Sequence, residues 1–297
     1  MAKLNDIRKR IQGINTTSKI TSAMKLVATA RIQRQKTSFL ELSQFVSNLY
    51  GLLKNLSKNV DFNEVFDVKN IKSEENLYVI ITSSLGLCGP YNINVCKHAA
   101  SLIKENDKII IVGERGFDYL KNHGYAKQIV NQYNVGNDSR NYIEIAPLTL
   151  MITEAYKQGK YKSVHLIYTK YKNSLSFEPV DLQILPFDHA MFNPEASDKP
   201  YNEHSELNEN NQIIETLTSK SKIIKNFISF IVGSVITSAI DESRLCEYSS
   251  RRNAMESATD NAKEIIEELK QKYNQARQEK ITQEINEIIA GSGEMEG

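Results

Sequence analysis

Helix-breaking residues are concentrated in the middle of this 297-residue chain. All six prolines lie between positions 90 and 200, and residues 14–50 and 234–290 contain neither proline nor glycine. In a helix interior, proline costs about 3 kcal/mol and glycine about 1 kcal/mol relative to alanine. The two long runs that lack both residues therefore predict two long helices at opposite ends of the chain, with a compact domain between them.

The N-terminal helix is expected to run from near Leu4 to about Leu56, with Gly51 as a point where it bends or ends. At 1.5 Å per residue, such a helix is about 80 Å long. Its first apolar residues are spaced by three and four positions, and small residues continue the same stripe. Small side chains allow a partner helix to approach closely.

The C-terminal run has alternating three- and four-residue spacing, which is typical of the seam of a left-handed coiled coil. Arg252 and Thr259 interrupt the apolar register, as polar residues that specify a pairing can. Each long helix has only the other as a partner of comparable length, so we expect an intramolecular antiparallel coiled coil. The predicted seam comprises Leu245, Tyr248, Arg252, Met255, Thr259, Ala262, Ile266, Leu269, Tyr273 and Ala276.

Between the two helices, predicted strands and helices alternate. This order predicts an α/β sandwich with a partly parallel, Rossmann-like sheet. Strands are expected at 77–81, 108–112, 164–170 and 182–185, and helices at 92–104, 117–122 and 145–157. The predicted domains are therefore an N-terminal coiled-coil helix at 1–57, a central α/β domain at 75–190 and a C-terminal coiled-coil helix at 206–290. Residues 188–215 carry a net charge of −6 and are expected to form a solvated connector.

The turn at residues 83–92 occupies the position of a phosphate-binding turn, between a strand and a helix. It contains neither GxGxxG nor GxxxxGK[ST], so the sequence favours a packed structural turn over a nucleotide site. Cys88 in this turn shares no motif with a histidine, which favours a buried apolar role over a nucleophilic one. Two acid pairs, Asp241–Glu242 and Glu267–Glu268, are expected on helix surfaces, where neighbouring side chains diverge by about 100° and form no dyad.

Other classes of site and location find little support. The five histidines form no HxxxH or HExxH, and the three cysteines form no CxxC, which argues against a metal site or a disulfide scaffold. No cofactor is predicted. No apolar stretch approaches the length of a membrane span. The N-terminus has no apolar signal core, which argues against secretion.

Positive charge is concentrated in the N-terminal helix. Residues 1–57 carry ten Lys or Arg and two acids, whereas the net charge of the whole chain is +1. Such a helix could bind nucleic acid, a membrane surface or an acidic protein. Residues 1–38 contain no aromatic side chain for base stacking, and the apolar stripe is committed to the seam. An acidic protein partner is therefore favoured.

Both ends of the chain closely resemble the γ subunit of F-type ATP synthase. The motifs that carry the resemblance are residues 7–11 (IRKRI), 17–28 (TSKITSAMKLVA), 257–262 (SATDNA), 273–278 (YNQARQ) and 281–288 (ITQEINEI). The middle of the chain resembles the family moderately, through its Gly-Leu-Cys-Gly turn. It departs from the family at Ser84-Leu85, where Asp-Arg is usual, at Pro90, where a second Gly is usual, and at residues 291–297, where the end is usually short and apolar.

The resemblance implies a non-catalytic rotor subunit, the central shaft of F1. Its coiled coil would sit inside a hexamer of three α and three β subunits, and its α/β domain would meet the ε subunit and the membrane ring of c subunits. Rotation driven by proton flow would be coupled to ATP synthesis or hydrolysis on the β subunits. The chain would be a peripheral protein on the cytoplasmic face of the cell membrane, with no nucleic-acid partner and with membrane contact only through the complex.

Matching motifs also suggest which residues contact the α3β3 hexamer. The set is Lys19, Met24, Lys25, Arg34, Arg251, Gln278, Thr282, Glu284 and Glu287. In the family, the equivalents of the last four of these residues lie in a segment that contacts the β subunit and affects coupling.

Three alternatives remain open on sequence alone. The altered turn and terminus are compatible with a γ-like shaft of a specialised F1-like ATPase that performs other mechanical work. A coiled-coil adaptor whose basic arm binds nucleic acid would show salt-dependent DNA binding by residues 1–57. A nucleotide-dependent enzyme is the least favoured, because the phosphate-binding motifs are missing.

Two further expectations concern the C-terminal tip. Ile281, Ile285 and Ile288 or Ile289 should form one apolar stripe beyond the end of the partner helix. Gly291 and Gly293 should end the helix, since glycine is favoured just past a helix C-terminus.

Overall fold

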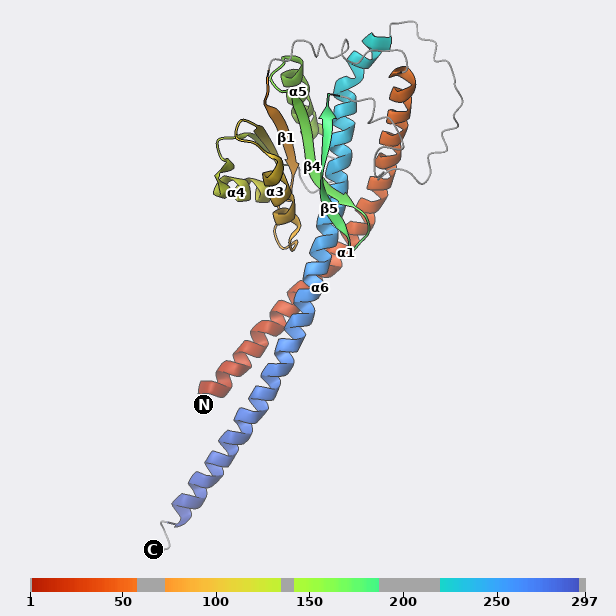
Figure 1. Cartoon of the computed structure of the whole chain (residues 1–297). Helices are drawn as coiled ribbons and strands as arrows, with labels where there is room; N and C mark the ends of the chain where they lie inside the picture. The colour runs from red at the N-terminus through yellow and green to blue at the C-terminus, as the bar shows by residue number, and fades with distance from the viewer. Residues whose placement is uncertain (1, 58–72, 135–141, 187–219, 294–297) are drawn as a thin grey trace. The chain divides into compact units, whose positions relative to one another are not determined.

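The structure, a computed structural model, describes residues 2–57, 73–134, 142–186 and 220–293 (Figure 1). Helix α1 (Ala2–Ser57) opens the chain and helix α6 (Lys220–Gly293) closes it. Between them, five strands form one sheet flanked by shorter helices. The prediction of a Rossmann-like α/β domain with two long terminal helices is confirmed.

The chain divides into two compact units. Unit 1 contains Met1–Thr29 and Arg251–Gly297, and unit 2 contains Ala30–Ser250. Both long helices therefore contribute to both units. The pairing is antiparallel within each unit: Thr21 meets Thr259 in unit 1, and Ser38 meets Asp241 in unit 2. The predicted antiparallel pairing of the chain ends is thus present.

The sheet of unit 2 has the strand order β3-β2-β1-β4-β5. Strands β1 to β4 are parallel, and β5 pairs antiparallel with β4. A run such as Lys108–Val112 consists almost entirely of β-branched residues, as expected for a parallel strand that is covered on both faces. The strands are β1 (Asn76–Ile81), β2 (Lys108–Val112), β3 (Ile129–Tyr133), β4 (Ser163–Tyr171) and β5 (Phe177–Leu185).

Two apolar cores cover the two faces of this sheet. Because side chains alternate along a strand, Val79 of β1 enters one core and Ile80 enters the other. Helix α5 (Tyr142–Lys157) and the first part of α6 pack in the core of Val79. Helices α3 (Tyr91–Leu102) and α4 (Glu114–Leu120) pack in the core of Ile80, and a short π-helix, η2 (Lys121–Tyr125), follows α4.

Two features of the fold differ from expectation. Strand β3 was not predicted, because its polar Asn131 and Gln132 break the apolar pattern and it lies at the sheet edge. Helix α6 contains Gly233 and extends through Gly291 to Gly293, so Gly291 does not end it. At Gly233, an added Cβ would lie 3.3 Å from Thr149 of α5, so the glycine allows close helix packing. Helix α1 likewise continues through Gly51. The acidic connector at 188–215 lies outside the described residues.

Candidate interface along the paired terminal helices

The predicted coiled-coil seam is the inner face of α6. Of its ten members, Leu245, Met255, Ala262 and Leu269 are among the buried residues, and none of the ten is exposed. On α1, the small residues of the stripe behave in the same way, since Ala28 is 2% exposed. The three-four periodicity therefore identified the contact face correctly.

A polar pair interrupts the seam of unit 1. The hydroxyls of Thr21 and Thr259 lie 2.7 Å apart and are buried. Thr259 was predicted to be a polar seam residue, and Thr21 is its partner. The hydrogen bond between the two hydroxyls can form in this register only, so it favours this alignment of the two helices over neighbouring ones.

The outer face of unit 1 combines positive charge with exposed apolar side chains. Lys25 Nζ lies 2.7 Å from Glu256 Oε1 of α6, and both side chains are substantially exposed. Ile20, Leu26 and Val27 are 56%, 68% and 55% exposed. Large apolar side chains grouped on a surface are typical of a protein-binding site. Sequence reasoning placed no function on Leu26, although its position off the seam stripe was a usable signal.

The nine predicted contact residues do not share one environment. Lys19 and Arg34 are exposed on α1, whereas Met24 and Lys25 are half-buried. Arg251 is only 7% exposed, so its guanidinium is held within the protein rather than offered to solvent. Four of the predicted residues lie on the distal part of α6. Gln278, Thr282 and Glu284 are exposed, and the side chain of Glu287 lies outside the described residues.

The edge of the sheet where a Rossmann fold would bind a nucleotide is occupied by α6. The Tyr171 backbone N–H at the end of β4 donates to Glu242 Oε1 (2.9 Å), and Ser250 Oγ donates to the Cys88 carbonyl in the β1–α3 turn (2.7 Å). Ligands of doubly wound sheets bind at the carboxyl ends of the strands. Here that crevice is filled by the chain's own helix, which agrees with the prediction of a packed structural turn.

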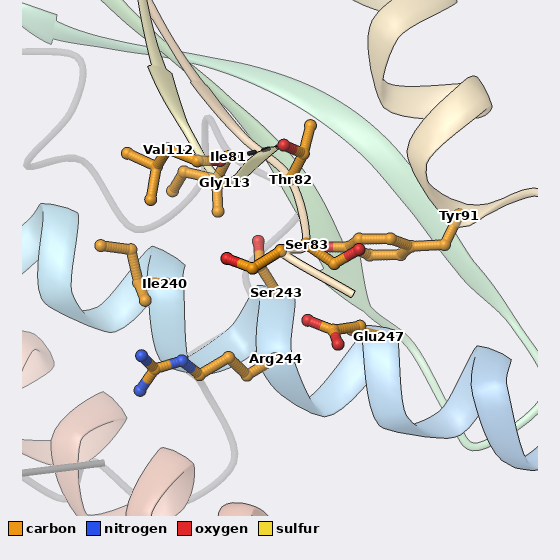
Figure 2. Close-up of a pocket in the computed structure, with 11 residues that line it drawn as sticks. Ile81, Thr82, Ser83, Tyr91, Val112, Gly113, Ile240, Ser243, Arg244 and Glu247 are labelled. Atoms are coloured by element: carbon orange, nitrogen blue, oxygen red, sulfur yellow. Dashed lines mark hydrogen bonds between the residues drawn. The ribbon is translucent and has the colours of Figure 1, made fainter. Parts of the chain in front are cut away.

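A small cavity remains at this edge. Figure 2 shows Ser243 of α6 beside Ser83, with Glu247 close by; Arg244, Thr82 and residues at the ends of β1 and β2 complete the lining. Its volume is about 20 Å³, which is room for about one water molecule and too little for a nucleotide.

Two acids expected on a helix surface are buried. Asp241 and Glu242 are 3% and 0% exposed, which corrects the expectation of a solvated pair. Burial raises the pKa of Glu242 to about 7, an effect that the Tyr171 N–H opposes. Burial also raises the pKa of Asp241. The hydrogen bond that Ser38 Oγ donates to Asp241 Oδ2 (2.9 Å) acts in the opposite direction and lowers this pKa. The expectation failed because α1, the sheet and the β4–β5 hairpin surround α6 here on several sides.

One constellation in unit 2 has the outline of a serine-hydrolase triad. His165 Nδ1 lies 3.0 Å from both carboxylate oxygens of Asp181, and His165 Nε2 lies 2.8 Å from Ser163 Oγ. However, Ser163 Oγ also donates to Asn76 Oδ1 (2.7 Å), and Ser163 is only 8% exposed. A buried serine hydroxyl that is engaged by Asn76 is not presented to a substrate, and the group is therefore a structural network.

The remaining chemical groups offer no further site among the described residues. Cys88, Cys96 and Cys246 are buried thiols that form no disulfide, and burial raises the pKa of Cys96 to about 12. Within the described ranges, no three His, Cys, Asp or Glu side chains are grouped so that they could hold a metal ion. No helix in the described part of the chain combines the length and apolarity needed to cross a membrane.

Comparison with known proteins gives matches over nearly the whole chain. The sequence model of the family described as ATP synthase (ATP-synt) matches residues 3–293. The ATP synthase gamma chain of Malacoplasma penetrans (strain HF-2) is 37% identical over 293 residues, which cover 98% of this chain and 99% of the relative. That of Ureaplasma parvum serovar 3 (strain ATCC 27815 / 27 / NCTC 11736) is 34% identical over 290 residues, covering 97% and 99%.

Solved structures share the fold. A chain of the Euglena gracilis mitochondrial ATP synthase, in an OSCP/F1/c-ring assembly, aligns with a TM-score of 0.70 at 21% identity, covering 99% of this chain and 95% of that one. A chain of the rotor of the same synthase aligns with a TM-score of 0.66 at 19% identity, covering 94% and 99%. Nothing in these matches supports the alternative of a specialised motor.

Proposed function

Because the chain belongs to the ATP synthase gamma chain family, we propose that it is the central-stalk rotor subunit of an F-type ATP synthase and catalyses no reaction itself. Rotation of the rod couples proton flow through the membrane sector to ATP synthesis or hydrolysis on the β subunits. An asymmetric rod inside a ring of alternating subunits holds the three β subunits in different conformations, so that each turn drives every β subunit through the reaction cycle.

The exposed face of unit 1 is the observation that carries this proposal. An isolated helix pair in water would place polar side chains on its outer surface, but here Leu26 and Ile20 are more than half exposed beside lysines. A sleeve of other subunits would cover these apolar side chains and offer acidic groups to the basic helix.

The partners follow from the same assignment. They are the α and β subunits of the α3β3 hexamer, the ε subunit and the c-ring. The matched Euglena assembly contains F1 and a c-ring, and a similar chain comes from a Tetrahymena thermophila structure of a central stalk with its c-ring. The chain lies at the cytoplasmic face of the membrane, which it touches only through the complex, and it binds no nucleic acid.

The contact residues belong to the proposal as well. Exposed residues such as Lys19, Arg34 and Thr282 are positioned to touch the hexamer directly. Arg251 is buried, so it acts by holding the helices that carry the contacts. The full set of proposed positions is Lys19, Met24, Lys25, Arg34, Arg251, Gln278, Thr282, Glu284 and Glu287.

The absence of catalysis is supported by the packing of α6 into the strand-end crevice, where Ser250 and Glu242 bind backbone groups that a ligand would otherwise meet. The proposed domains are those expected from sequence, 1–57, 75–190 and 206–290, with the two helical segments acting as the shaft.

Purification of the native complex through a tag on this chain tests the function. We expect three α and three β chains for each copy of it, and ATP hydrolysis that is lost when the β subunits are removed. Recovery of the chain without α and β subunits, or hydrolysis by the chain alone, would contradict the proposal.

A further inference from the structure

The end of strand β4 is fastened to α6 by three polar contacts inside unit 2. The Tyr171 backbone N–H donates to Glu242 Oε1 (2.9 Å). The Thr169 backbone N–H donates to Ser243 Oγ (3.4 Å), and Cys246 Sγ donates to the Thr169 carbonyl (3.5 Å). Glu242, Ser243 and Cys246 are at most 1% exposed, so all three contacts are shielded from water. We refer to these three contacts as the β4 latch.

The geometry of the β4 latch suits a neutral Glu242 carboxyl better than a carboxylate. The side chain is 0% exposed, and its Oε2 has no hydrogen-bond partner within the described residues. A buried carboxylate is stable only where donors or a contacting cation replace its hydration. In a protonated carboxyl, Oε1 accepts the Tyr171 N–H as a carbonyl oxygen and Oε2 carries the proton, so no charge is buried.

The groups that β4 turns toward Glu242 do not offset its burial. Burial raises the pKa of Glu242 to about 7, although the Tyr171 N–H, the Lys170 ammonium and the Tyr168 hydroxyl all lower it. The carboxyl therefore holds its proton to a much higher pH in the folded protein than in an open chain.

The other elements packed against this part of α6 direct their charged groups to other partners. From α1, Ser38 Oγ donates to Asp241, and the Arg31 guanidinium lies 5.5 Å from the ring centroid of Tyr248. Arg244 Nη1 of α6 lies 3.7 Å from Asp241 Oδ1. The remaining titratable groups of the surroundings are thiols, a phenol and a carboxyl, which supply no positive charge: Cys88, Cys246, Tyr91 and Glu247.

We propose that Glu242 makes the β4 latch proton-sensitive: the carboxyl carries a proton while the latch is closed and releases it when the β4–β5 hairpin lifts from α6. The connection between the sheet and α6 then becomes firmer as the pH falls. This inference goes beyond the proposed function and does not depend on it, because every contact of the latch lies within unit 2 of this chain.

The direction of the pH dependence follows from proton linkage. The closed latch binds the proton more tightly than the open one, in which the carboxyl regains its ordinary pKa of 4.5. Opening should therefore become more frequent as the pH rises from 4.5 to about 7, and it should change little above pH 7.

Hydrogen exchange of the full-length chain between pH 5 and 8 tests the latch. The protection factor of the Tyr171 amide, which corrects for the pH dependence of exchange itself, should fall roughly thirtyfold between pH 5 and pH 7 and then level off. Glu242→Gln keeps an acceptor for this amide and removes the titration, so its protection should be nearly equal at pH 5 and pH 7. Glu267→Gln, at an exposed position of α6, is the matched control and should keep the fall.

The Ile110 amide separates local from global opening. Ile110 lies in the middle of β2 and is 0% exposed, so its amide should exchange only when unit 2 unfolds. The Tyr171 amide should be less protected than the Ile110 amide throughout this pH range. Equal protection of the two amides, or a fall in Tyr171 protection that persists in Glu242→Gln, would overturn the inference.

A second pair of variants keeps the proposal testable if Glu242→Gln does not fold. Lys170→Gln removes the ammonium that lowers the pKa of Glu242, so the fall in Tyr171 protection should extend to higher pH. Lys172→Gln is the control on the same hairpin, because Lys172 Nζ pairs with Glu178 Oε1 (2.7 Å), and it should leave the profile unchanged. A Lys170→Gln profile that coincides with that of the parent would contradict control of the latch by Glu242.

Discussion

The hydroxyls of Thr21 and Thr259 share a hydrogen bond across the helix pair of unit 1, with 2.7 Å between the oxygens. Each hydroxyl also reaches a carbonyl of its own helix: Thr259 Oγ1 lies 2.7 Å from the Met255 carbonyl, and Thr21 Oγ1 lies 3.1 Å from the Ser18 carbonyl. One of the two hydroxyls therefore donates across the helix pair while the other keeps the bond within its own helix.

Replacement of one threonine should cost more than replacement of both. Thr259→Val removes one of the two hydroxyls, and we expect unit 1 to lose about 1–2 kcal/mol of opening free energy. Thr21→Val/Thr259→Val removes donor and acceptor together, so its loss should be smaller than the sum of the single losses by about 1 kcal/mol. Native-state hydrogen exchange of the α1 amides in unit 1 measures each opening free energy. Additive losses would show that the hydroxyls are not coupled.

The buried carboxyl of Glu242 should make stability depend on pH. Its pKa is about 7 in the folded protein against an ordinary 4.5, so the unfolded chain loses this proton first as the pH rises. Stability should therefore fall between about pH 4.5 and 7 and level off above, by on the order of 3 kcal/mol in all. Glu242→Gln keeps an acceptor for the Tyr171 N–H and removes the titration.

The measurement is urea unfolding of parent and Glu242→Gln from pH 5 to 8. The difference between them isolates this group, because Asp241, whose pKa is also raised, titrates in both. A difference in unfolding free energy that stays constant over this range would contradict the assignment.

The burial of Glu242 also shows where sequence reasoning stops. The seam of α6 could be predicted because its period persists from Leu245 to Ala276, and, among the described residues of unit 1, only α1 covers the helix. Between Val235 and Ser250, α6 is buried on nearly all sides, by α1, by the sheet, by the β1–α3 turn and by the β4–β5 hairpin. This burial cannot be predicted from the helical period of the sequence, because the elements that cover α6 come from distant parts of the chain.

The same limit applies to the candidate interface. Motif resemblance selected Lys19 and Thr282, which are exposed, and also Arg251, which is buried. The exposure of Leu87 could not be predicted from sequence, because it depends on a left-handed turn that is held by Asn92 and Ser250. The general α/β order was predictable from apolar runs, whereas edge strand β3 was not.

Two glycines should respond to alanine in opposite directions. At Gly116, an added Cβ would lie 2.5 Å from Thr82 Oγ1, whereas at Gly13 it would meet nothing within 4 Å. Gly116→Ala should destabilise unit 2 by about 1–3 kcal/mol through overpacking. Gly13→Ala, inside α1, should stabilise the helix by about 0.5–1 kcal/mol. Thermal unfolding followed by circular dichroism checks both, and equal shifts of Tm in one direction would refute the contrast.

The distal part of α6 should act through its apolar stripe. If the register of the Thr21–Thr259 pair continues one for one, Leu4 lies level with Ala276, and no described part of α1 lies beside residues 279–293. In this segment Ile281 and Ile285 are 45% and 50% exposed. We expect the α3β3 hexamer to cover these two side chains and to act as a bearing for the tip of the helix.

Ile281→Gln/Ile285→Gln removes the apolar stripe and keeps helix-forming side chains, whereas Ile281→Leu/Ile285→Leu keeps both. The Gln variant should match the parent in helix content as a free chain, because these side chains are already half exposed. In reconstituted α3β3γ it should lower assembly yield or torque several-fold, and the Leu variant should not. Removal of residues 294–297, which carry two acids and no apolar run, should leave assembly and ATP hydrolysis nearly unchanged. If the Gln variant assembles and turns like the parent, or if the short truncation is as damaging as the Gln variant, the stripe is not the bearing contact.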